Sequence, residues 1–138
     1  MSHTQLQFMK NQTEDTDQDD QAVEDVLDGV SRYFSLLSEP MRLRIIHSIC
    51  NQEKSVSDIV QATGANQANV SRHLSLLFSA GVLGRRKQGN FVFYFVSDPT
   101  LTDICRTVCN RMAVQIGTDE SSRIQAQSLA QGFESARQ

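Results

Sequence analysis

The 138-residue chain is large enough for one domain with a modest core and too short for a two-domain enzyme. Hydrophobic residues make up 39% and charged residues 21%, a composition that excludes collagen-like and globally disordered proteins. The net charge of −3 hides a division: residues 1–28 hold eight acidic residues and one lysine, whereas residues 29–97 hold eight basic residues and three acidic ones. A basic middle segment is typical of a module that binds a polyanion, and the alternative is a soluble domain with an acidic tail.

The cysteines and the lengths of the apolar runs indicate the cellular compartment and whether the chain associates with a membrane. Three cysteines without a secretory pattern in residues 1–10 favour reduced thiols and a cytoplasmic protein. No apolar run approaches the roughly 18 residues of a membrane span, so no membrane partner is expected. An enzyme is not expected either, because the sequence has no nucleophile–base–acid set, no phosphate-binding glycine loop and no Cys-x-x-Cys motif.

The N-terminal part of the chain divides into an arm and a helix. Residues 1–20 are polar with few apolar side chains, which predicts a disordered acidic arm. Residues 21–117 are expected to form one domain, and residues 118–138 a C-terminal tail with a thin helical pattern. The first helix of the domain is predicted over residues 22–37, because its apolar residues recur at spacings of three and four. These residues are Val23, Val26, Leu27, Val30, Phe34 and Leu37.

A helix-turn-helix follows. Pro40 suits the first turn of a second helix, which carries Leu43, Ile46 and Ile49 on one side. A short third helix begins at Ser55, with Asp58 as a partial capping signal, and ends at Gly64. A fourth helix is predicted over residues 66–80 from a single apolar stripe. The members of this stripe are Val70, Leu74, Leu77 and Phe78.

After Gly81 the pattern changes to a β-hairpin. Residues 82–87 and 91–96 read as strands joined by a glycine-containing turn at residues 88–90. The alternating Phe91, Phe93 and Phe95 are expected to pack in the core rather than to stack on bases. A last helix is predicted from residue 99 to about Gly117.

This arrangement suggests binding to double-stranded DNA. A helix fits the major groove, where amide side chains pair with adenine and arginine pairs with guanine. Residues with this chemistry cluster near the start of the fourth helix, and a basic run in the hairpin can reach phosphates. The predicted contacts are Gln67, Ala68, Asn69, Ser71 and Arg72 in the helix, and Arg85, Arg86 and Lys87 in the hairpin.

Three segments resemble the ArsR/SmtB family of bacterial winged-helix repressors. They read SEPMRLRI at residues 38–45, VSRHLSLLFSAGV at residues 70–82 and YFVSD at residues 94–98. The resemblance implies an α+β, mainly α, winged helix-turn-helix with four helices, two strands and a fifth helix. It also implies a homodimer formed through the first and last helices, which binds an operator inverted repeat and is released by an inducer. By position in the motif, the recognition-helix contacts of the family fall on Gln67, Ala68, Ser71 and Arg72.

The chain lacks two metal sites that occur in the resembling family. Members that bind metal through the third helix carry Cys-x-Cys-Asp, whereas this chain has Ser55-Val56-Ser57-Asp58. Members that bind zinc or nickel through the last helix use Asp and His, and this chain has no histidine after His73. The remaining candidates for a sensing site are the thiols.

Cys105 and Cys109 are four residues apart and therefore lie on the same side of the last helix. The helical pattern predicts Cys105 half-buried and Cys109 accessible. Soft thiolates select thiophilic ions, so the pair is a candidate metal site for As(III), Sb(III) or a soft metal, with Cys50 as a third ligand. Such an ion is the expected inducer, and no cofactor is expected to be required.

Two alternatives remain open. In the first, the same repressor responds to oxidation or reactive sulfur, with Arg106 and Arg111 lowering the thiol pKa. His47 rather than Cys50 stands where the sulfur-responsive members of the family place their first cysteine. In the second alternative, a winged-helix module binds another protein without sensing an inducer, and its acidic arm is a regulatory tail.

Overall fold

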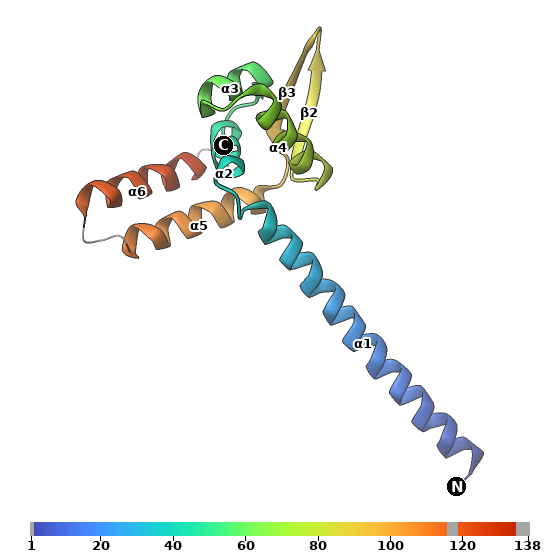
Figure 1. Cartoon of the computed structure of the whole chain (residues 1–138). Coiled ribbons are helices and arrows are strands. Elements are labelled where there is room, and N and C mark those ends of the chain that lie inside the picture. The colour runs from blue at the N-terminus through green and yellow to red at the C-terminus, as the bar shows by residue number, and fades with distance from the viewer. Residues whose placement is uncertain (1, 116–118, 135–138) are drawn as a thin grey trace. The chain divides into compact units, whose positions relative to one another are not determined.

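The computed structural model of the chain describes residues 2–115 and 119–134. These residues fall into two compact units, residues 1–38 and residues 39–138 (Figure 1). The first unit is a single helix, α1 (His3–Leu36), with no buried residue. None of the described helices is long and apolar enough to span a membrane.

The helix α1 differs from the sequence prediction at its start. A disordered arm was expected over residues 1–20, but the structure continues the helix back to His3. No glycine or proline occurs before Gly29, so nothing in the sequence interrupts the helix. The hydroxyl of Thr16 donates to the Gln12 carbonyl at 2.8 Å, and the Gln21 amide donates to Asp25 at 3.0 Å. Local bonds of this kind take the place of packing along the helix.

Three helices surround the core of the second unit. They are α2 (Pro40–Ile49), α3 (Val56–Thr63) and α4 (Gln67–Ser79), and they contact one another. The largest fully buried side chains are Ile45, Ile46, Ile49, Ile59, Val70, Leu74, Leu77 and Leu101. The predicted caps of α3 are confirmed, since Ser55 and Asp58 form a reciprocal capping box and Gly64 is left-handed at φ +71°.

A three-stranded antiparallel sheet packs beside these helices, in the order β1 (Lys54–Ser55), β3 (Phe91–Val96), β2 (Leu83–Gln88). The predicted hairpin is confirmed, with Gly89 at φ +59° in its two-residue turn. Gly84 is required in β2, because a Cβ there would meet the Phe95 ring at 2.3 Å. The short strand β1 was not predicted.

The last two helices lie side by side as a helical hairpin (Figure 1). They are α5 (Pro99–Gln115) and α6 (Glu120–Glu134). Residue 117, the predicted end of α5, lies outside the described residues. The helical pattern in the C-terminal tail is confirmed over residues 120–134, where Ala126, Ala130 and Phe133 are buried. The helix α6 also contacts α2.

The element order of a mainly helical winged helix-turn-helix is therefore confirmed, with β1 and α6 added to it. The prediction that the three phenylalanines pack in the core is wrong for Phe91, which is 61% exposed. Phe93 and Phe95 are half-buried, and the buried aromatic residue of β3 is Tyr94. Phe91 is the first residue of β3 after the turn, and β1 pairs with β3 only at Phe93 and Tyr94.

Candidate nucleic-acid interface and thiol cluster

The N-terminal end of α4 is fixed by a side-chain cap. The Asn66 side-chain oxygen accepts a hydrogen bond from the Asn69 backbone N–H at 2.8 Å, which starts the helix at Gln67. Val70 and Leu74 on one side of the helix are fully buried. The predicted contact residues lie toward the other side: Gln67, Ala68 and Arg72 are exposed, and Asn69 and Ser71 are half-buried.

Two of these side chains are already joined. Arg72 Nη2 donates to the Asn69 amide oxygen at 2.8 Å, one turn away along α4. The bond holds a guanidinium and a carboxamide together on the exposed end of the helix. Both groups present hydrogen-bonding edges that match those of purine bases in the major groove.

The basic run of the hairpin is split by the pleat of β2. The Arg85 guanidinium carbon lies 4.0 Å from the centre of the Phe78 ring, on the side of α4. Arg86 instead pairs with Glu53, and this bond lowers the pKa of the Glu53 carboxyl. Lys87 is exposed. The structure therefore brings Arg85 to α4 and directs Arg86 to the opposite side of the sheet.

A buried histidine, which sequence reasoning did not single out, connects α4 to α2. His73 is 6% exposed, and its Nε2 lies 3.7 Å from the carboxylate of Glu39, the N-cap residue of α2. Arg42 Nη1 lies 3.5 Å from His73 Nδ1. Burial lowers the pKa of His73 and the nearby arginines add to this, while Glu39 opposes it. The ring is therefore neutral at pH 7 and positions α4 by hydrogen bonding rather than by charge.

The three thiols are neighbours in the second unit, since each of the other two influences Cys105. Burial, together with the charges of Cys109 and Cys50, raises the pKa of Cys105 to about 11. Cys105 is buried at 5% exposed rather than half-buried as predicted, and Cys109 is half-buried. Burial also raises the pKa of Cys50 and Cys109.

The expected lowering of the thiol pKa by arginine is wrong. Arg106 pairs with the Asp103 carboxylate at 3.2 Å, so its charge is largely compensated one turn from the thiols. Desolvation then decides the direction of the shift, because the buried thiolate loses its hydration.

Helix α6 covers Cys50. The Cys50 sulfur lies 3.2 Å from the carbonyl oxygens of His47 and of Gly132 in α6. Helices α2 and α6 lie so close together that a Cβ at Gly132 would lie 2.6 Å from His47 Nε2. The His47 ring also packs edge-to-face on Phe133, with the ring centres 5.2 Å apart. No local pattern in the sequence signals this contact, because Gly132 is 82 residues from Cys50.

The thiols do not form a ready site for a metal ion with three protein ligands. Among residues 2–115 and 119–134, no group of three or more His, Cys, Asp or Glu side chains is close enough to hold one. The three cysteines are thus near one another without completing such a site. The protein ligands that lie on one helix are the two thiols of Cys105 and Cys109 on α5.

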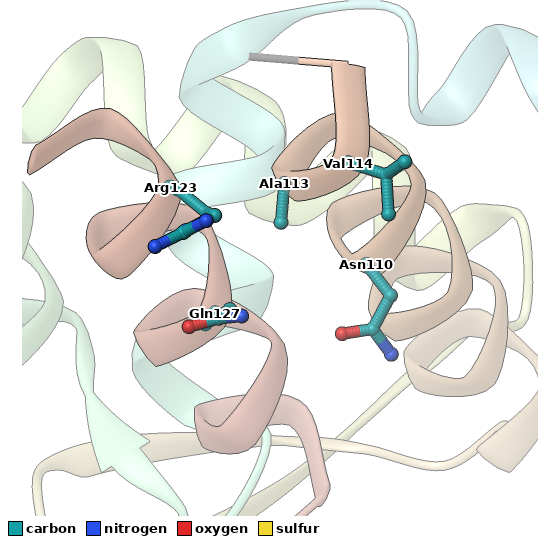
Figure 2. Close-up of a pocket in the computed structure, with 5 residues that line it drawn as sticks. All are labelled: Asn110, Ala113, Val114, Arg123 and Gln127. Carbon is teal, nitrogen blue, oxygen red and sulfur yellow. The ribbon is translucent and has the colours of Figure 1, made fainter. Parts of the chain in front are cut away.

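An open pocket lies between α5 and α6, on the C-terminal side of Cys109 along α5. Figure 2 shows the side chains that line it, which offer amide and guanidinium groups but no thiol or imidazole. They are Asn110, Ala113, Val114, Arg123 and Gln127.

The segment from α2 to α4 matches a known protein family. Residues 39–83 match the family described as bacterial regulatory protein, arsR family. The chain is 34% identical over 77 residues to a probable mercury resistance operon repressor of Streptomyces lividans, covering 56% of this chain and 62% of that protein. It is 36% identical over 71 residues to the cadmium resistance transcriptional regulatory protein CadC of Listeria innocua, covering 51% and 60%. The chain thus spans about three fifths of the length of these curated relatives.

A solved structure agrees with the fold. The homodimeric winged helix-turn-helix DNA-binding domain Mb0332 of Mycobacterium bovis, a possible ArsR-family regulator, superposes with a TM-score of 0.54. The two sequences are 28% identical, and the match covers 71% of this chain and 85% of that one.

Proposed function

Because this chain carries the arsR-family helix-turn-helix at residues 39–83, we propose that it is a homodimeric transcriptional repressor. In this proposal the dimer binds an operator inverted repeat, and the complex dissociates when thiols of the protein bind a thiophilic inducer. The chain is a regulator rather than an enzyme. Its binding groups are a helix end, a hairpin and a dithiol.

The observation that carries the DNA-binding part is the two-sided character of α4. One side is buried in the core, while the N-terminal end presents Gln67, Ala68 and Arg72 to solvent. Such a helix end can enter the major groove without unfolding any part of the domain. The adjacent hairpin adds Arg85 and Lys87, which can reach the flanking phosphates.

The test starts from a random-sequence pool of DNA duplexes, since the operator is unknown. We expect the reduced protein to enrich duplexes with an inverted repeat whose half-sites lie about one helical turn apart. Gln67→Ala should relax the preference at one position of each half-site. Ser79→Ala, at the exposed far end of α4, is the matched control and should leave the preference intact. Enrichment of no sequence, or the same preference in Gln67→Ala, would overturn the proposal.

The homodimer is supported by the homodimeric relative and by the apolar surface of α1. Within its unit, α1 exposes a stripe of large apolar side chains at helical spacing, which water does not stabilise. The stripe comprises Val23, Val26, Leu27, Val30 and Phe34. Sedimentation should give a dimer for the reduced protein and a monomer for Val30→Glu. Monomeric wild-type protein at micromolar concentration would contradict this part.

The inducer proposal rests on Cys105 and Cys109, with Cys50 nearby. Two thiols one helical turn apart match the coordination preference of soft ions such as Hg(II), Cd(II), As(III) or Sb(III). Burial raises the pKa of both thiols, so an ion that binds them has to displace their protons.

The sensing test uses the enriched duplex and titrates the complex separately with Hg(II), Cd(II), As(III), Sb(III) and a polysulfide. We expect at least one of the ions to release wild-type protein and the Cys105→Ser/Cys109→Ser double variant to stay bound. Release of the double variant at the wild-type concentration of ion would remove these thiols from the mechanism. Release by polysulfide alone would favour the reactive-sulfur switch instead.

A further inference from the structure

The three basic residues of the hairpin do not share one face. Successive side chains of a strand point to opposite sides, so Arg85 and Lys87 point one way and Arg86 the other. Arg85 lies over Phe78 of α4, which identifies its side as the one facing the recognition helix. Arg86 is registered with Phe93 of β3, and its guanidinium carbon lies 4.7 Å from the centre of that ring.

The Arg86 guanidinium is held by two acceptor side chains, those of Glu53 and Gln88. Its Nε donates to the two carboxylate oxygens of Glu53, at 2.9 and 2.7 Å, and its Nη2 bonds to the same carboxylate. Its Nη1 donates to the Gln88 side-chain oxygen at 2.8 Å. All three nitrogens therefore have acceptors in the protein. A bidentate pair of this kind has the geometry that makes a partly exposed ion pair effective.

The position of Glu53 gives the pair a structural role. Glu53 immediately precedes β1, which pairs with one edge of β3, while Arg86 is on β2 at the other edge. The ion pair thus crosses the central strand and ties the two outer strands together over Phe93. It connects the hairpin to the segment that leads into α3, the first helix of the helix-turn-helix.

We infer that Arg86 and Glu53 are positioning residues that fix the hairpin relative to the helix-turn-helix, and that the hairpin contacts DNA phosphates through Arg85 and Lys87. The inference rests on the proposed DNA-binding function. Transfer of Arg86 to a phosphate would leave the Glu53 carboxylate unpaired close to a polyanion, which like-charge repulsion opposes. The basic run therefore supplies two contacts per subunit rather than three.

The first test measures how DNA affinity depends on salt, using the enriched duplex. Each lost phosphate contact lowers the slope of log K against log salt by about 0.9. Arg85→Ala and Lys87→Ala should each lower the slope by about that amount per subunit. Glu53→Gln/Arg86→Ala, which removes the pair without leaving an unpaired carboxylate, should lower affinity by roughly fivefold or less while the slope stays at the wild-type value. A slope reduction in this double variant equal to that in Lys87→Ala would overturn the inference.

The second test exchanges the charges. Arg86→Glu alone should weaken DNA binding, and the Glu53→Arg/Arg86→Glu double variant should recover most of the affinity at an unchanged net charge. If Arg86 contacted a phosphate, the double variant would stay as weak as Arg86→Glu, because position 86 would still carry a negative charge. That result would overturn the inference.

A third measurement separates this inference from the proposed function, because it needs no DNA. Amide hydrogen exchange of β2 and β3 should become faster in Arg86→Ala and return toward wild type in the charge-exchanged double variant. If wild-type protein bound no duplex but showed this pattern, the proposed function would fail while the positioning role survived. Unchanged exchange in Arg86→Ala would reject the positioning role whatever the protein binds.

Discussion

The N-terminal end of α4, where we propose that DNA binds, and the three thiols differ in how accessible they are. The α4 end is exposed, and Arg72 and Asn69 are already held together on it. The thiols are covered: Cys50 and Cys105 are 7% and 5% exposed, and burial raises the pKa of all three cysteines. In the proposed function, the α4 end binds DNA without rearrangement, whereas the thiols have to lose protons and local packing before they bind an ion.

This difference suggests how the two sites are coupled. A ligand that binds a preformed surface leaves the fold unchanged, whereas a ligand that binds buried thiols favours a conformation with altered packing. Cys50 is the C-cap of α2, and α2 is joined to α4 through Glu39, Arg42 and His73. In the proposed function, an ion bound at the thiols would therefore act on α2, which also supports α4.

The largest expected effect is a loss of DNA affinity that is not accompanied by a loss of folding stability. Arg72→Ala should weaken binding to the enriched duplex by about 1–3 kcal/mol, the usual value of a bidentate base contact. Because Arg72 is exposed, the free energy of unfolding should change by less than about 0.5 kcal/mol. Fluorescence anisotropy and urea unfolding measure the two quantities. Equal losses of affinity and stability would show that Arg72 supports the fold, and the end of α4 would then not differ from the buried thiols in this respect.

The next effect is the pH dependence of stability at Cys105. Its pKa is about 11 in the folded protein against 9.0 for an ordinary thiol, so the unfolded chain releases this proton first as the pH rises. The unfolded state then binds fewer protons, and stability falls between pH 9 and 11, by about 2 kcal/mol. Urea unfolding across this range should show a clearly larger loss in wild type than in Cys105→Ala, which keeps only the smaller contributions of Cys50 and Cys109. Parallel curves for the two proteins would indicate an ordinary thiol pKa.

A smaller effect is the difference in folding stability between serine substitutions at the two cysteines of α5. Cys105→Ser places a hydroxyl in a buried apolar position and should cost about 1–2 kcal/mol. Cys109→Ser, at a half-buried position, should cost less than about 0.5 kcal/mol. Urea unfolding at pH 7 measures both. The reverse order would mean that Cys109 rather than Cys105 faces the core.

The smallest expected effect is a change in the reactivity of Cys50, which α6 shields from solvent. Gly132→Ala adds a methyl group 2.6 Å from His47 Nε2, so either the His47 ring or the end of α6 has to shift, and both movements loosen the packing over Cys50. Alkylation of Cys50 by iodoacetamide should become roughly fivefold faster, which corresponds to about 1 kcal/mol of local opening. The matched control is Gln131→Ala, which introduces the same residue at an exposed neighbouring position and should leave the rate unchanged. A wild-type rate in Gly132→Ala would show that α6 does not protect the thiol.

The sequence predicted those features that depend on local patterns. The stripe from Val70 to Leu77, the box formed by Ser55 and Asp58, and the turn at Gly89 each follow from a few neighbouring residues. The resemblance to a known family placed the candidate DNA contacts on the exposed end of α4.

The features that were missed depend on distant contacts. The partner of Arg86 is 33 residues away, and the α6 carbonyl that contacts Cys50 is 82 residues away, so neither has a local signal. The direction of the thiol pKa shift was wrong for the same reason, since burial in the folded unit outweighs the arginines nearby in the sequence. The helix over residues 3–20 was missed because its apolar content is low.

Methylation protection of guanine N7 on the enriched duplex tests the central claim most directly, since N7 lies in the major groove. If the exposed ends of two α4 helices enter successive major grooves, two protected segments should appear about one helical turn, roughly 34 Å, apart on one face of the duplex. Both should vanish when the thiophilic ion that releases the protein is added. Binding without any N7 protection would contradict the account, because it would mean that α4 does not enter the groove.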